Sequence, residues 1–97
     1  MKKINLNKKL KNYLCFYDIE DQKTRNKLVK FLKQYGFRVQ KSVFICFLEK
    51  DDKKRIIEYF KKIKNKDDKI GFVILCKNCF SKIQLYPKQN LKSYDII

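Results

Sequence analysis

Short runs of apolar residues, each about the length of a β-strand, recur along the chain and are separated by polar segments. The apolar stretch in the middle of the chain is too long for one strand, and its polar centre, Gln40-Lys41-Ser42, predicts a turn between two strands. The first four expected strands lie at 13–18, 37–40, 42–48 and 69–76. A further strand is expected at 83–86, where Pro87 would end it, and a last one at 93–97.

Two segments between these strands carry apolar residues at the spacing of an α-helix. The first opens at Glu20 and Asp21, because acidic residues suit the first turn of a helix and Asp21 can cap it. Gly36 is expected to end this helix, since glycine is common just beyond a helical C-terminus. The second helix is expected to begin at the acidic residues Glu49, Asp51 and Asp52. The apolar stripes are Leu28, Val29, Leu32 and Tyr35 in the first helix, and Ile56, Ile57, Phe60 and Ile63 in the second.

The order of these elements is β-α-β-β-α-β with an extra C-terminal strand. It predicts an α+β, ferredoxin-like sandwich in which two helices cover one face of an antiparallel sheet. A chain of 97 residues is long enough for one domain, which we place at residues 13–97. Residues 1–12 contain five lysines and no acidic residue, and we interpret them as a basic N-terminal arm.

Both faces of the expected sheet are apolar, although two helices can cover only one of them. In the first strand, Cys15 and Tyr17 point to one face while Leu14 and Phe16 point to the other. A sheet with one face in water should instead alternate apolar and polar residues. A second copy of the chain is the simplest cover for the other face, which predicts a homodimer packed through sheet faces. An unrelated partner protein is the alternative.

The chain is strongly basic, with 25 Lys and Arg residues against 10 Asp and Glu residues and a formal net charge of +15. Such a charge attracts polyanions, and nucleic acid is the commonest one, because neutralised phosphates release counterions. An A+T-rich genome would explain the preference for lysine over arginine, but it does not require an excess over acidic residues. No apolar run reaches membrane-spanning length and the N-terminus lacks a signal-peptide core, so we expect a cytoplasmic protein with no membrane partner.

The chain has no histidine, which excludes an imidazole base and the nucleophilic arrangements that depend on one. Hydrolysis would therefore need carboxylates, a metal ion, lysine or tyrosine. Cys15 and Cys46 lie in apolar runs and are interpreted as buried free thiols. Cys76 and Cys79 form one C-x-x-C motif, which fits half a zinc site, a redox pair or a turn with no chemical role. A zinc site needs two more ligands and the chain has no second such motif, so the turn is favoured.

Asp18 follows an apolar run at the end of the first expected strand, and two interpretations stay open for it. The simpler one is a helix cap or a turn residue, since aspartate is common at such places. The other depends on the dimer, in which Asp18 of each copy would approach the two-fold axis. Two carboxylates with water would then hold one Mg²⁺ per dimer, and a hydrated metal beside phosphate can activate water for phosphodiester cleavage.

Arg25 and Arg38 are two of only three arginines in a lysine-rich chain. Where codon usage favours lysine, an arginine indicates a need for its planar, two-pronged group, and phosphate contact is the obvious use. A surface ion pair is the alternative for each. Tyr17 and Phe44 have the chemistry to stack on bases of a bound nucleic acid, but aromatic residues at strand positions more often belong to the core.

Several of these residues also resemble a known family. Tyr17-Asp18-Ile19, then Asp21 and Arg25, and then residues 35–44 are similar to the signature of the small CRISPR-associated endoribonuclease family. That family is the non-integrase subunit of the CRISPR spacer-acquisition complex. Residues 36–44 are the most specific part, and the resemblance extends from about residue 13 to residue 86. The basic arm departs from the family, whose members usually begin almost at the first strand.

The resemblance implies a ferredoxin-like homodimer in which Asp18 is the metal-binding and catalytic acid, with one Mg²⁺ shared by both copies. It implies supporting roles for Tyr17 and Phe44, and nucleic-acid contacts for Arg25 and Arg38. The implied partners are the larger integrase subunit and duplex DNA or single-stranded RNA.

Three functions follow as hypotheses from these observations. The first is a Mg²⁺-dependent endonuclease, which the position of Asp18 favours. The second is a non-catalytic scaffold that bridges integrase dimers on DNA, which the lack of a fuller catalytic set favours. The third is a toxin-type ribonuclease on the same fold, which residues 36–44 disfavour.

Overall fold

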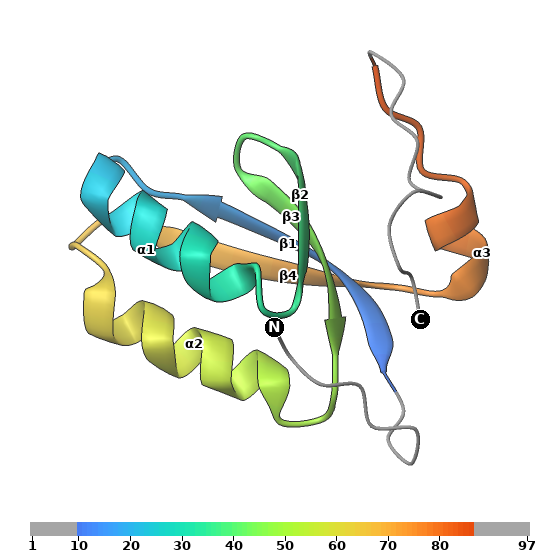
Figure 1. The fold of residues 1–97 in the computed structure, drawn as a ribbon, viewed down its shortest axis with the longest axis horizontal. Coiled ribbons are helices and arrows are strands. Elements are labelled where there is room, and N and C mark those ends of the chain that lie inside the picture. Colours follow the sequence, from blue (N-terminus) through green and yellow to red (C-terminus); the bar gives the residue numbers. More distant parts are fainter. Residues whose placement is uncertain (1–9, 87–97) are drawn as a thin grey trace.

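The structure, a computed structural model, describes residues 10–86. Its elements are β1 (Lys11–Asp18), α1 (Gln22–Leu32), β2 (Gly36–Gln40), β3 (Val43–Leu48), α2 (Asp52–Ile63), β4 (Lys69–Leu75) and α3 (Lys77–Ser81). The strands form one antiparallel sheet in the order β2-β3-β1-β4. Helices α1 and α2 lie side by side along the sheet, and α3 lies apart from them beyond the end of β4 (Figure 1). The expected α+β, ferredoxin-like architecture is therefore confirmed.

The strand β1 begins earlier than the sequence pattern predicts. Lys11 is paired with Leu48 and Asn12 with Phe47, so these two residues belong to the sheet and not to the expected basic arm. Residues 1–9 of that arm and the expected strand at 93–97 lie outside the described residues. Within residues 10–86, no helix is long and apolar enough to cross a membrane.

Both long helices begin at the acidic residues that the sequence indicates. Asp21 caps α1: its carboxylate accepts hydrogen bonds from the backbone N–H and the hydroxyl of Thr24, both at 2.9 Å. These bonds hold the pKa of Asp21 below its usual range. Asp52 opens α2 and is fully buried, where it accepts hydrogen bonds at 2.8 Å from the backbone N–H of Glu49 and from Arg55. Asp52 thus holds the connection between β3 and α2 together.

Gly36 does not end the first helix, so that expectation is wrong. The helix α1 stops at Leu32, and Gly36 is the first residue of β2, where it is paired with Cys46. A Cβ atom at Gly36 would collide with the backbone oxygen of Ile45 and would lie 2.8 Å from Cα of Cys46. Glycine is needed here because two strands approach closely, and not because the chain turns at a helix end.

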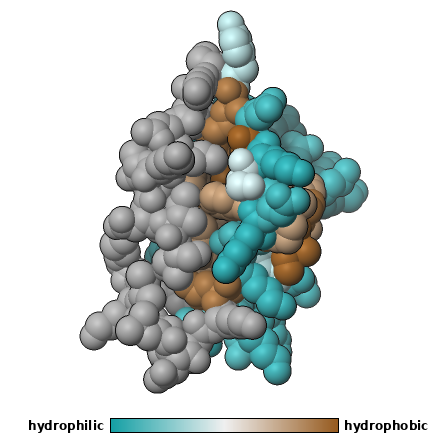
Figure 2. Space-filling view, turned by 90° about the vertical axis from the view of Figure 1, so that its right-hand side faces the viewer, coloured by the Kyte–Doolittle hydropathy of each residue, from teal (hydrophilic) through white to brown (hydrophobic). Residues whose placement is uncertain are grey.

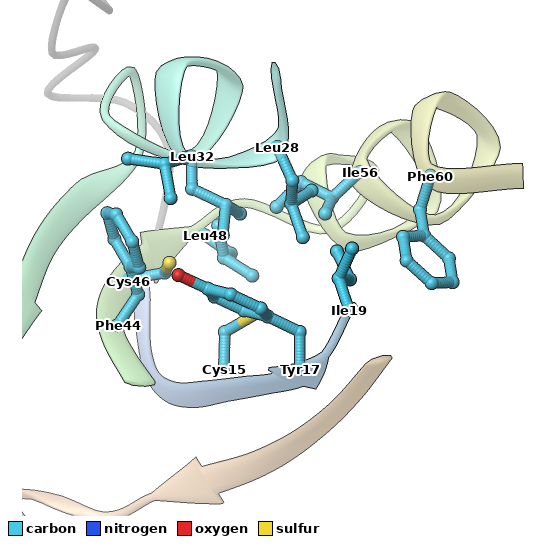
Figure 3. Close-up of a cluster of buried hydrophobic side chains, with 11 residues drawn as sticks. Cys15, Tyr17, Ile19, Leu28, Leu32, Phe44, Cys46, Leu48, Ile56 and Phe60 are labelled. Atoms are coloured by element: carbon cyan, nitrogen blue, oxygen red, sulfur yellow. The ribbon is translucent and has the colours of Figure 1, made fainter. Parts of the chain in front are cut away.

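The main core lies between the sheet and the helices α1 and α2 (Figure 3). Alternate strand residues point into it, because successive side chains of a strand face opposite sides. Cys15 and Cys46 are fully buried free thiols, as the sequence predicts. The buried core also contains Tyr17, Ile19, Leu28, Val29, Leu32, Phe44, Leu48, Ile56 and Phe60.

The opposite face of the sheet, which we call the outer face, is covered in part by the chain itself. A second buried cluster consists of Val39, Ile45 and Phe47, against which Phe80, Ile83 and Leu85 pack. Residues 83–86 form no strand, so that expectation is wrong: Ile83 and Leu85 pack against the face of the sheet instead of extending it. Figure 2, which views the α3 side of the molecule, shows apolar residues gathered in a band there. Over β1 and β4 the outer face is more open, since Phe16 is 43% exposed and Val73 is 47% exposed.

Candidate functional site

Asp18 is the last residue of β1, and its side chain is exposed. Tyr17 points into the core, so Asp18 points to the outer face, because neighbouring strand residues face opposite sides. On that face Asp18 is paired with Lys69, and the next pair along the same side is Phe16 with Gly71. The carboxylate therefore lies on the same face as the exposed ring of Phe16. Since Asp21 caps α1, the interpretation of Asp18 as the helix cap is wrong.

Arg25 holds the backbone that follows Asp18. Its guanidinium donates hydrogen bonds from Nη1 to the carbonyl oxygens of Ile19, at 2.9 Å, and Glu20, at 3.2 Å. These bonds tie the first turns of α1 to the loop between β1 and α1, and so they position the end of β1 where Asp18 lies. The sequence predicts a phosphate contact or an ion pair for Arg25, but it gives no sign of these carbonyl contacts.

Tyr17 links β1 to the turn between β2 and β3. Its hydroxyl donates a hydrogen bond to the carbonyl oxygen of Lys41 at 3.1 Å, and its backbone N–H donates to the carbonyl of Ser42, also at 3.1 Å. Burial raises the pKa of the Tyr17 hydroxyl, although the charges of Arg38 and Arg25 act to lower it. Both arginines that the sequence singles out thus lie near this hydroxyl, at the end of the sheet that carries Asp18.

The two aromatic residues of the predicted site belong to the core. Phe44 is fully buried and Tyr17 is 4% exposed, and their rings pack at a centroid distance of 6.5 Å. A base cannot stack on a ring that is enclosed in this way, so the structure supports the core interpretation for both. Both rings thus belong to the core that packs beneath the strand carrying Asp18.

A single chain does not provide a complete metal site among its described residues. Asp18 supplies one carboxylate, which is the hard oxygen ligand that Mg²⁺ prefers, and its exposure leaves it accessible to an ion. In residues 10–86, no group of three or more Cys, Asp or Glu side chains is placed to hold a metal ion. Two acids of the adjoining loops have other contacts: Asp21 caps α1, and Asp68 accepts a hydrogen bond from the backbone N–H of Asn65 at 2.8 Å. Asp18 therefore fits Mg²⁺ as one ligand of a site that needs a second carboxylate from elsewhere.

A model of the family described as CRISPR associated protein Cas2 matches residues 11–83, which is most of the chain. The chain belongs to the Cas2 family. The match runs from β1 to the end of α3 and includes Asp18, Arg25 and Arg38. The resemblance drawn from residues 17–19, Asp21, Arg25 and residues 35–44 is thereby confirmed.

Individual Cas2 proteins are similar to this chain in sequence and in structure. It is 32% identical over 80 residues to CRISPR-associated endoribonuclease Cas2 3 of Synechocystis sp., over 81% of this chain and 87% of that protein. The crystal structure of Streptococcus pyogenes Cas2 matches with a TM-score of 0.70 and 28% identity, over 76% of this chain and 96% of that one. A chain of a partial Cas6-RT-Cas1–Cas2 complex matches with a TM-score of 0.65 and 32% identity, over 84% of this chain and 96% of that one.

Proposed function

We propose that this Cas2 protein works in CRISPR adaptation with the integrase Cas1, as a homodimer whose two Asp18 carboxylates share one Mg²⁺ for phosphodiester cleavage. The observation that carries the proposal is the position of Asp18, exposed at the end of β1 on the same face as Phe16. The relative named endoribonuclease supports the activity, and the similar chain from a complex that contains Cas1 supports the partner.

The open part of the outer face supports the homodimer. Phe16 and Val73 are each almost half exposed, and by their strand pairing they share a face with Asp18 and Lys69. Burial of apolar surface against a second copy contributes roughly 25 cal/mol per Å². A two-fold contact uses the same patch on both copies, so a dimer formed through this patch brings both Asp18 residues to one interface.

The residues around Asp18 have distinct parts in the proposed cleavage. Mg²⁺ bound there would activate a water molecule and neutralise charge on the phosphate. Each Asp18 supplies one carboxylate to it, with water completing the ligands, because Mg²⁺ keeps several waters in protein sites. Arg25 positions the end of β1 through the carbonyls of Ile19 and Glu20. Arg38 is exposed and presents its guanidinium to a phosphate of single-stranded RNA or duplex DNA.

A non-catalytic scaffold is the second candidate function. Asp18 is a single carboxylate without a supporting cluster in residues 10–86, and bridging two integrase dimers on DNA requires no catalysis. The exposed lysines of the two long helices offer a basic surface for duplex phosphates. They are Lys23, Lys27 and Lys30 in α1, and Lys53, Lys54, Lys61 and Lys62 in α2.

Molar mass and metal dependence of the purified full-length protein test the proposed function. Light scattering should give twice the chain mass of 11.9 kDa, and cleavage of RNA or DNA should require Mg²⁺ and stop with a chelator. A stable monomer would remove the shared metal site. A dimer that cleaves nothing, yet is needed with Cas1 for spacer integration, would leave the scaffold as the function.

Nucleic-acid binding should weaken steeply as salt is added. With several lysines and arginines on phosphates, affinity for a short duplex should fall on the order of 10³-fold between about 50 and 200 mM salt, because releasing counterions into more concentrated salt gains less entropy. Fluorescence anisotropy with a labelled duplex measures this at constant protein concentration and pH. An affinity that is unchanged over this range would contradict phosphate recognition.

A further inference from the structure

The four cysteines of the chain fall into two pairs that differ in exposure. Cys76 and Cys79 are exposed at α3, whereas Cys15 and Cys46 are fully buried in the main core. A hydrogen bond with Cys15, together with burial, raises the pKa of Cys46 and keeps that thiol protonated. In the folded protein, the exposed pair is therefore the one that a reagent in solution can reach.

The two exposed cysteines are in contact with each other. The backbone N–H of Cys79 donates a hydrogen bond to Sγ of Cys76 at 3.2 Å. The turn between them is closed by a hydrogen bond of 2.9 Å from the backbone N–H of Phe80 to the carbonyl of Cys76. A disulfide needs Cα atoms about 4.4–6.8 Å apart, which residues one helical turn apart satisfy. The pair can thus be oxidised without unfolding the turn.

These hydrogen bonds make the two thiols chemically unequal. Donation from the backbone N–H and from the thiol of Cys79 lowers the pKa of Cys76. The same contact raises the pKa of Cys79. At any pH below both values, Cys76 has the larger fraction of thiolate, which is the nucleophilic form. One thiol is therefore suited to attack and the other to resolve.

The pair borders a hollow of about 640 Å³ at the ends of β1 and β4. Its lining has an apolar part, which includes Leu75 and Phe80, and a cationic part, which consists of Lys11 and Lys77. None of the residues described as lining it is acidic. A small molecule that reacts here is therefore favoured if it carries negative charge.

We propose that Cys76 and Cys79 form a redox-active dithiol that is oxidised by anionic small-molecule disulfides of the glutathione class. The Cys76 thiolate attacks one sulfur of the disulfide, breaks its S–S bond and releases a thiolate that takes up a proton. The Cys79 thiol then gives its proton to solvent, and its sulfur attacks Sγ of Cys76 and displaces the second small thiolate, which is also protonated. The protein loses two hydrogen atoms, and one small disulfide becomes two thiols.

Peptide mass spectrometry after reaction with glutathione disulfide tests this order of events in the full-length chain. The expected product is a Cys76–Cys79 disulfide, with Cys15 and Cys46 still reduced as evidence that the protein stays folded. In Cys79→Ser the reaction should stop at a mixed disulfide on Cys76. Cys76→Ser should react with glutathione disulfide at no more than about one tenth of the wild-type rate. Glutathione that appears first on Cys79, or no disulfide at all, would overturn the proposal.

Two measurements on the wild-type chain make the test independent of the cysteine variants. Alkylation of Cys76 should reach its plateau at a lower pH than alkylation of Cys79, since its pKa is lowered. For each disulfide, the rate with the protein is divided by its rate with a free small thiol. This ratio should be larger for glutathione disulfide than for the cationic disulfide cystamine. Lys77→Gln should reduce that preference, whereas the matched Lys61→Gln in α2 should leave it unchanged. Identical pH profiles, a preference for cystamine, or zinc retained on the pair after purification would each refute the proposal.

Discussion

Replacing Asp18 with Asn is expected to lower Mg²⁺-dependent cleavage on the order of 10²- to 10³-fold while the protein still folds and dimerises. Asn keeps the size of the side chain and one carbonyl oxygen, but it removes the negative charge that would hold the metal ion. Asp18 is exposed at the end of its strand and lies outside both buried clusters, so the fold does not depend on its charge. Initial rates over a Mg²⁺ titration, with light scattering on the same samples, measure both effects.

The matched control for this variant is Asp67→Asn. Asp67 is exposed in the connection between α2 and β4, so its replacement changes the net charge by the same amount. Cleavage should stay at the wild-type level in this control. If Asp18→Asn also cleaves normally, Asp18 is not the catalytic acid. If neither variant nor the wild type cleaves, but integration with Cas1 proceeds in all three, the scaffold function accounts for the protein.

Hydrophobic periodicity was sufficient to predict the layers of this fold, because it depends on which side of each element is buried. The stripes of α1 and α2 and the apolar strands define a sheet with two helices, and this requires no knowledge of strand pairing. The role of Gly36 does depend on pairing. Its position opposite Cys46, with the Ile45 backbone close by, follows from the register of β2 and β3, which is set by the whole sheet.

In the candidate site, too, a local sequence pattern reveals some residues, whereas the roles of others depend on tertiary contacts. Asp18 is found from sequence because an acid after an apolar strand is a local pattern. The contacts of Arg25 with the carbonyls of Ile19 and Glu20 depend on how the loop turns back over the helix, which no spacing reveals. Likewise, the buried Asp52 looks in sequence like any acid at a helix start, although it binds Glu49 and Arg55.

The covering of the outer face narrows the surface available for a dimer. Because both alternating sets of strand residues are apolar, the sequence predicts that a second copy covers the whole of this face. In the structure, Phe80, Ile83 and Leu85 already cover the cluster formed with β2 and β3. The exposed apolar residues Phe16 and Val73 lie on β1 and β4, the part of the face that also carries Asp18. A dimer confined to this part places the paired acids closer to its centre than a contact over the whole face would.

Gly36→Ala is expected to destabilise the protein by about 3 kcal/mol or more, which corresponds to a Tm roughly 12 °C lower for a domain of this size. The new Cβ would overlap the backbone oxygen of Ile45 and lie 2.8 Å from Cα of Cys46. Ile45 and Cys46 lie in β3, an inner strand that is paired on both sides, so β2 could make room only by giving up its pairing with β3. Thermal unfolding followed by circular dichroism measures the loss. An unchanged Tm would show that β2 is not held as close to β3 as the structure has it.

Gly71→Ala separates this steric effect from a general cost of replacing strand glycines. Gly71 lies in β4 opposite Phe16, and the new Cβ would meet only the far end of the Phe16 ring, 2.6 Å from Cε2. Because that side chain is 43% exposed, it can rotate aside, and we expect a loss below about 1 kcal/mol. The same variant moves Phe16 within the proposed dimer surface. Its free energy of dimerisation should therefore change by more than its free energy of unfolding. Equal losses of stability in both variants would mean that the close approach at Gly36 is not the cause.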